Sequence, residues 1–203
     1  AAPKVITSSD GSTSITVESM SLTMDIAVSV TPYTNPNVPP AVNSEDHGVT
    51  GTVCGGADVS FVRSDNGKKA TLEEIGWNTT DPTKNMITPR TSKVLGDKDA
   101  ETLNNLASQG LVTLSLWYYD MTDNSDKTWT KAGDAQVEFN PTANGGNGSY
   151  SLASASGIYL NVLYPFVFAY ESVIVDPTIT ITGTVKDTSD NAIENALVFA
   201  NET

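Results

Sequence analysis

A loop rich in carboxylate and amide side chains is the first place where this sequence could do chemistry. It follows directly after the strongly apolar residues 111–119, so we expect its oxygen atoms to gather at the end of a strand. Calcium takes about six to eight oxygen ligands from loops of this kind. The candidate ligands are Asp120, Asp123, Asn124 and Asp126. Their spacing departs from the helix-loop-helix calcium motif, and an Asp/Asn-rich turn that satisfies its own backbone is the open alternative. Calcium is the one cofactor that the sequence suggests.

Nucleophilic and metal chemistry lack the residue types that they need. The chain has one histidine, His47, in an acidic loop, and one cysteine, Cys54, at a predicted strand end. A Ser-His-Asp triad or a multi-histidine metal site is therefore poorly supported, and we expect no enzyme activity. Cys54 has no disulfide partner in the chain, and we expect it to be a small buried apolar residue.

The tryptophans are candidates for stacking against a sugar ring. Trp117 ends an apolar run and is expected to lie in the core, whereas Trp77 and Trp129 stand in polar contexts that favour exposure. Carbohydrate binding is kept as a minor alternative on this ground. Sequons for N-linked glycans begin at Asn78, Asn147 and Asn201, and they are permitted sites only.

Composition excludes several classes of partner. The net charge is −13 and the isoelectric point is near 4.2, so there is no basic surface to neutralise the phosphates of nucleic acid. No apolar run approaches the roughly 20 residues that span a bilayer, and we expect no membrane span. The Ser/Thr-rich, Lys-poor composition and the start at Ala1-Ala2-Pro3 favour an exported protein at the cell surface. Removal of an initiator Met would leave the same start.

The elements that must position these residues are mainly strands. Apolar and polar side chains alternate through residues 20–30, and Ile15 and Val17 continue the pattern in the opposite phase, which predicts one strand over 15–30 with a bulge near Glu18-Ser19. Its apolar face is Met20, Leu22, Met24, Ile26, Val28 and Val30. The Pro-rich residues 32–40 then predict an extended linker.

Further strands and one helix are predicted beyond the linker. The strands cover residues 49–53, 59–63, 111–119, 149–152, 157–164 and 166–175, with turns at Gly55-Gly56, 65–68 and 144–148. Trp129, Val137 and Phe139 are assigned to one or two more strands, and residues 70–96, with Pro82 and Pro89, are assigned to irregular structure. Residues 99–109 predict the helix, because acidic residues begin it, Leu103 and Leu106 are three apart, and Gly110 ends it. The fold class expected is all-β, an antiparallel β-sandwich of transthyretin-like or jelly-roll-like form with one short helix in an insertion.

A short pattern occurs twice along the chain. Residues 49–61 read as an alternating strand, a polar turn and a second strand that begins with Ala, and residues 181–200 repeat this order. The second copy would be the opening hairpin of a fold that the chain does not complete. A hairpin of this size cannot bury a core by itself, so it needs a partner.

The glycine and tyrosine pattern in the later strands resembles a known family. Asn147-Gly148-Ser149-Tyr150, then Gly157-Ile158-Tyr159, resemble the second half of carboxypeptidase-regulatory-like domains, and residues 181–199 resemble the first half. The resemblance covers about half the chain and implies a transthyretin-like sandwich that serves as a spacer, adhesion or assembly module of exported proteins. It carries no catalytic residues.

These readings predict a domain plan and a function. The plan is an N-terminal strand segment (1–31), a linker (32–47), a sandwich domain (48–178, with 64–110 inserted) and a C-terminal hairpin (179–203). The function expected is an extracellular structural subunit that assembles with identical subunits into a filament or tube by β-strand donation. The donors would be the apolar face of residues 20–30, or Ile179, Ile181 and Val185. The alternatives are a fragment of a multidomain adhesin or carbohydrate-binding protein, and a virion tail or decoration protein.

Overall fold

The chain forms two compact units in the computed structural model, Ala1–Val173 and Ile174–Thr203. The residues that the structure describes are 4–17, 25–34, 48–71, 74–75, 86–119, 128–155, 158–159, 165–173 and 184–193. Several predicted sites lie outside these residues. They are the calcium ligands Asp120, Asp123, Asn124 and Asp126, the strand residues Met20, Leu22, Met24, Ile179 and Ile181, the sequons Asn78 and Asn201, and His47 and Trp77.

The first unit is an antiparallel sheet structure. Its strands are β1 (Lys4–Thr7), β2 (Thr13–Val17), β3 (Ile26–Pro32), β4 (Thr52–Arg63), β5 (Met86–Thr91), β6 (Val112–Tyr119), β7 (Trp129–Asn140), β8 (Ser149–Ser154), β9 (Ile158–Tyr159) and β10 (Phe166–Ser172). Helix α1 (Ala100–Ser108) precedes β6, and the short 3-10 turn η2 (Asn144–Gly146) joins β7 to β8. The prediction of an all-β antiparallel fold with one short helix is confirmed.

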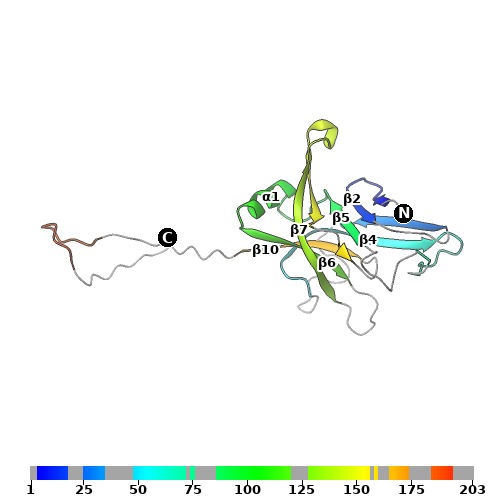
Figure 1. The fold of residues 1–203 in the computed structure, drawn as a ribbon, viewed down its shortest axis with the longest axis horizontal. Helices are drawn as coiled ribbons and strands as arrows, with labels where there is room; N and C mark the ends of the chain where they lie inside the picture. The colour runs from blue at the N-terminus through cyan, green and yellow to red at the C-terminus, as the bar shows by residue number, and fades with distance from the viewer. Residues whose placement is uncertain are drawn as a thin grey trace. The chain divides into compact units, whose positions relative to one another are not determined.

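The strands follow one path that almost closes on itself. Their order is β1-β2-β5-β8-β7-β6-β10-β4-β3, with β9 paired to β5 at the side, and β1 and β2 at one end approach β3 at the other. The long strand β7 turns the corner, because its first half pairs with β6 and its second half with β8. Figure 1 shows the β7–β8 hairpin projecting beyond the rest of the sheet. The result is a nearly closed, barrel-like sheet.

The main core lies inside this curved sheet. Ile15 and Leu152, from β2 and β8, share one buried cluster with Phe61 and Phe168, from β4 and β10. A smaller cluster on the outer face contains Trp117, Tyr119 and Trp129. Strand β6 contributes to both clusters, which is why its sequence is an almost continuous apolar run rather than an alternating one.

The predicted turn at Gly55-Gly56 is wrong. Strand β4 runs without interruption through both glycines and pairs with β3 on one side and β10 on the other. The glycines allow a close approach instead: a Cβ at Gly56, whose φ is +152°, would lie 2.3 Å from the carbonyl oxygen of Phe166. The ladder with β10 shifts register between Phe168, opposite Gly55, and Ala169, opposite Val53, so Cys54 is the extra residue of a β-bulge. The two predicted strands are therefore one.

The assignment of residues 70–96 to irregular structure is wrong for residues 86–91. These residues form β5, which lies between β2 and β8 in the strand path. Pro89 pairs with Ile15 of β2, and on its other side the ladder passes from β9 at Ile87 to β8 at Arg90. Pro89 therefore lies between the two ladders, at a position where its lack of an N–H removes no ladder hydrogen bond. The predicted insertion thus contributes a strand to the middle of the sheet.

The prediction of one bulged strand over residues 15–30 is also wrong. Val17 ends β2, which pairs with β1 and β5, whereas Ile26 begins β3, which pairs with β4. The shift in the apolar alternation, which suggested a bulge, instead marks the change from one strand to another. The two strands, β2 and β3, stand far apart in the strand order. Both strands belong to the first unit, so the described part of residues 1–31 is not a segment apart from the body.

Helix α1 begins and ends where its sequence predicts. The Oδ1 atom of Asp99 accepts a hydrogen bond from the backbone N–H of Thr102 at 2.7 Å, which satisfies one of the free donors of the first turn. Leu103 is fully buried, and Leu106 and Ala107 pack at the margin of the main core. The helix contacts β6, β7 and β8 and covers the region where β6 and β7 separate.

The described part of the second unit is a small exposed turn. Residues 184–193 form a bridge between Lys186 and Ala192, and the N–H of Ile193 donates to the carbonyl of Val185 at 2.8 Å. Val185 and Ile193 are 41% and 47% exposed. The turn therefore presents its apolar side chains to solvent within its own unit.

Candidate functional site

The strongest candidate site of the first unit is a gap in the strand path between β6 and β7. The ladder between these strands runs from Tyr119 and Trp129 to Ser115 and Asp134, and there it stops. Beyond that point, residues 112–114 pair with β10 and residues 135–140 pair with β8. Among the described strands, the two facing edges have no ladder partner, so their backbone groups are available for further pairing.

The gap contains a groove with a volume of about 500 Å³. Helix α1 forms one wall, and the separating parts of β6 and β7 form the others. The apolar lining residues are Ala107, Val112, Leu114, Ala135 and Val137. Val112 and Leu114 are buried, whereas Ala135 and Val137 are only half-buried and remain open to the groove. The groove therefore has an apolar floor between two hydrogen-bonding edges.

Polar side chains form the rim of the groove. Lys131 and Asp134, both largely exposed, make an ion pair at 3.0 Å, and Glu171 of β10 also lines the groove. Exposed ion pairs of this kind contribute little to stability, about 0 to 1 kcal/mol. The rim therefore presents both signs of charge around an uncharged interior.

Sequence reasoning missed this groove. The signal that could have indicated it is Gly133, because an isolated glycine inside a strand often marks a bulge. The β6–β7 ladder shifts register between Leu116 and Trp117, opposite Gly133 and Lys131. A bulge increases the local twist, and here β7 departs from β6 soon after it.

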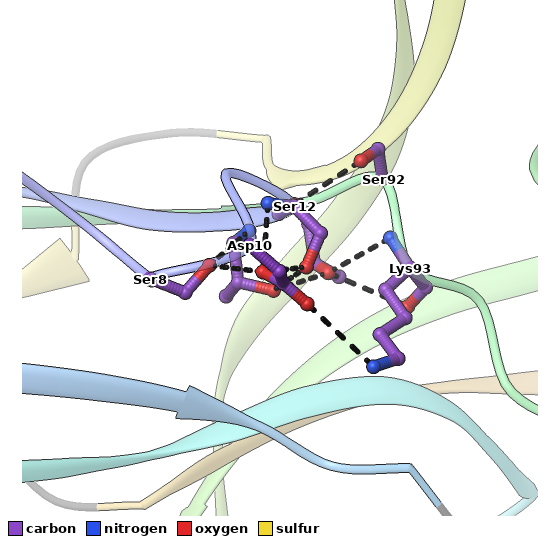
Figure 2. Close-up of polar contacts among 7 residues, drawn as sticks. Ser8, Asp10, Ser12, Ser92 and Lys93 are labelled. Carbon is purple, nitrogen blue, oxygen red and sulfur yellow. Dashed lines mark hydrogen bonds and ion pairs between the residues drawn. The ribbon is translucent and has the colours of Figure 1, made fainter.

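A second cluster of polar groups lies at the turn between β1 and β2. Figure 2 shows the Asp10 carboxylate turned toward Ser8, Ser12 and Lys93. Its Oδ1 atom accepts from the Ser8 and Ser12 hydroxyls at 2.7 Å and from the Ser12 N–H at 3.0 Å, and its Oδ2 atom lies 3.6 Å from Lys93 Nζ. The hydroxyl of Ser8 is the first cause that holds the pKa of Asp10 well below its ordinary value. The carboxylate thus ties the turn together, and its oxygens are occupied by the protein.

The single cysteine has the buried environment that was expected. Cys54 has no exposed surface, and its Sγ lies 3.5 Å from the carbonyl oxygen of Phe168. Burial raises the pKa of the thiol to about 12. A thiol with this pKa carries almost no thiolate near neutral pH and is a poor nucleophile. The interpretation of Cys54 as a small core residue is confirmed.

The tryptophans do not form an exposed platform where the structure describes them. Trp117 is buried as predicted, but the expected exposure of Trp129 is wrong: it is 3% exposed and packs against Tyr119 with ring centroids 5.3 Å apart. Its neighbours Thr130 and Lys131 are exposed, whereas Trp129 packs in the smaller cluster with Trp117 and Tyr119. Tyr118 is half-buried against the main core.

The N-terminal candidate donor has a partner in its own chain. Ile26 and Val30 are buried, and β3 pairs along its whole length with β4. Val28 is half-buried against the main core. The expectation that this end is unsatisfied within the chain is therefore wrong for residues 26–32, and donation by this strand is not carried further.

The C-terminal turn satisfies its own polar groups. Asp187 Oδ1 accepts from the N–H groups of Ser189 and Asn191 at 2.8 and 2.9 Å, and Lys186 pairs with Asp190 at 2.9 Å. The Asn191 side chain donates from Nδ2 to Asp187 Oδ2 at 3.1 Å, and this bond is the first cause that lowers the pKa of Asp187, ahead of the two backbone N–H groups. At the predicted turn over residues 144–148, the sequon residue Asn147 is exposed beside η2.

Three findings complete the description of the site. Within the described ranges, no group of three or more His, Cys, Asp or Glu side chains could hold a metal ion. The helical part of the described structure includes no stretch long and apolar enough to cross a membrane. Comparison with family models, with curated proteins and with solved structures found no match to this chain.

Proposed function

We propose that this protein is an extracellular structural subunit that joins identical subunits by donating its C-terminal strand. The observation that carries the proposal is the C-terminal unit, which clusters apart from the body and whose described apolar residues, Val185 and Ile193, are exposed. Residues 178–185 alternate Thr with Ile, Gly or Val, which is the pattern of a strand with one apolar face. Such a strand gains burial and backbone pairing when it joins the sheet of another subunit.

The size of the gain predicts assembly that depends on concentration. Burying Ile179, Ile181 and Val185 would stabilise the contact by on the order of 6 kcal/mol. Association costs about 4 to 15 kcal/mol, so side-chain burial alone does not give a tight complex. Backbone hydrogen bonds of an added strand must supply part of the affinity. Subunits are therefore expected to be monomeric when dilute and to assemble as their concentration rises.

Composition supports the location. A net charge of −13 and a low share of charged residues, 17%, fit a soluble surface exposed outside the cell more readily than a nucleic-acid or membrane partner. Location outside the cell and the filament or tube form are part of the proposal. A head-to-tail contact propagates unless its rotation closes a ring.

The test is assembly of full-length variants that differ in one face of the C-terminal strand. Size-exclusion chromatography and electron microscopy over a concentration series should show polymers of the unaltered protein. The double variant I179D/I181D should stay monomeric, whereas T178D/T180D, which places equal charge on the opposite face, should still assemble. A protein that is monomeric at every concentration, or an I179D/I181D variant that polymerises normally, would overturn the proposal.

A further inference from the structure

The gap between β6 and β7 is an interruption in an otherwise continuous ladder. On one side, residues 112–114 present an edge whose other side is paired with β10. On the opposite side, residues 135–140 present an edge whose other side is paired with β8. Edges of this kind attract another strand unless something covers them. Helix α1 lines the groove, and among the described strands neither facing edge has a ladder partner across it.

The first unit ends beside this groove. The N–H of Val173 donates to the carbonyl of Leu111 at 2.8 Å, immediately before β6 begins, and Glu171 lines the groove. Strand β10 runs antiparallel to β6, so its last residues lie beside the first residues of β6. A unit of 30 residues, Ile174–Thr203, follows this point in the chain.

The strand in that unit fits the groove in length and chemistry. Residues 178–185 are all β-branched except Gly183, and they carry no charge. An extended strand of this length covers about 25 Å. It can pair with the six residues 135–140 of β7 and still reach the shorter edge at 112–114. The groove interior is likewise uncharged, with its ion pair at the rim.

We propose that the groove between β6 and β7 accepts residues 178–185 of a second copy of this chain as an added strand. The apolar face of the donor, Ile179 and Ile181, packs against Val137 and Ala107 at the groove floor. Its backbone pairs with the free edge of β7. This inference rests on the proposed function and assigns the acceptor site that the proposed function leaves open.

Filling the groove tests the acceptor directly. Ser108 is exposed at the end of α1 and lines the groove, whereas Asn105 is exposed on the same helix and does not. The full-length variant S108W should raise the concentration needed for half-maximal assembly by about tenfold or more, equivalent to about 1.4 kcal/mol. N105W should assemble like the unaltered protein, and circular dichroism should show both variants folded. Equal assembly of S108W and N105W would overturn the acceptor assignment.

Amide hydrogen exchange gives a second readout that does not depend on a substitution. Exchange at residues 112–114, 135–140 and 178–185 should slow together when the unaltered protein assembles. Protection at the outer edges of β1 or β3 in place of the groove would overturn the assignment. Protection of the groove in a dilute monomer would show that the segment enters its own groove, which also overturns it.

A mixing experiment separates this inference from the proposed function. I179D/I181D keeps the groove and loses the donor, whereas S108W keeps the donor and loses the groove. A mixture should form dimers and stop there, because each pair has one working contact. Assembly by S108W with none by I179D/I181D would leave strand donation standing and remove this acceptor. Normal assembly by I179D/I181D would remove strand donation itself.

Discussion

The hydroxyl oxygens of Thr13 and Thr91 lie 2.8 Å apart in the buried interior, where they join β2 to β5. Thr13 is 1% exposed and Thr91 is fully buried. Thr91 Oγ1 also accepts from the backbone N–H of Lys93 at 3.1 Å. Two polar side chains at this depth are tolerated because each satisfies the other. The pair fixes the register of β2 against a strand that carries a proline.

The first prediction concerns this pair. T91V should lower the free energy of unfolding by about 1 to 3 kcal/mol, because it leaves the Thr13 hydroxyl and the Lys93 N–H without their acceptor. T13V should cost less, since it removes the bond to Thr91 and a longer contact, 3.4 Å, with the hydroxyl of Ser12. The double variant should cost less than the sum of the two, with a coupling of about 1 kcal/mol in urea unfolding. Additive costs would mean that the hydroxyl bond contributes nothing.

The second prediction compares two glycines in long strands. G56A should destabilise the protein by more than about 2 kcal/mol, because a Cβ there would lie 2.3 Å from the Phe166 carbonyl oxygen at a φ of +152°. G133A is the matched control, since nothing lies within 4 Å of its Cβ position. Thermal unfolding of both variants checks the difference. Similar melting temperatures would contradict the close approach of Gly56 to Phe166.

The third prediction concerns the reactivity of Cys54. Burial raises the pKa of its thiol from 9.0 to about 12, so the native protein should resist alkylation at pH 8. Full labelling is expected in denaturant. Because the folded pKa is raised, the stability contributed by the neutral thiol is present below pH 9 and is lost as pH rises toward 12. The free energy of unfolding of C54A should therefore not show this loss at alkaline pH. Rapid labelling of the native thiol would contradict the burial.

The fourth prediction concerns the pH dependence of the β1–β2 turn. The pKa of Asp10 is lowered from an ordinary value of 3.8, first by the Ser8 hydroxyl. The stability that this carboxylate contributes is therefore present above pH 3.8 and is lost as pH falls below it. D10N should be less sensitive to acid than the unaltered protein in urea unfolding between pH 2 and 6. S8A is the control. It keeps the carboxylate but removes the Ser8 hydroxyl, so the pKa of Asp10 measured by NMR should move toward its ordinary value.

Much of the local structure could be predicted from neighbouring residues alone. Asp99 caps α1, Leu103 and Leu106 face the core, and residues 65–68 form the expected tight turn, in which Lys68 N–H donates to Asn66 Oδ1. The projecting hairpin turns at residues 144–148 as its glycines and asparagines indicate. Caps and turns are determined by side chains within a few positions of the backbone groups that they satisfy.

The errors all involve residues whose role depends on a distant strand. Gly56 looked like a turn, but it accommodates Phe166 across the sheet. Pro89 looked like a strand breaker, but it falls at an interruption between β9 and β8. Trp129 looked exposed, but it packs against Tyr119 of the neighbouring strand. None of these partners lies within the local window that a sequence pattern samples.

The sequence by itself determined the all-β class, the helix and the main turns, because periodicity and turn chemistry act over a few residues. Only the tertiary structure decided that β3 belongs to the same sheet as the body, and that β6 and β7 separate beside α1 to leave a groove. Strand pairing depends on burial and close backbone approach between residues that are distant in sequence. A free edge can therefore be identified only when the pairing of all its neighbouring strands is known.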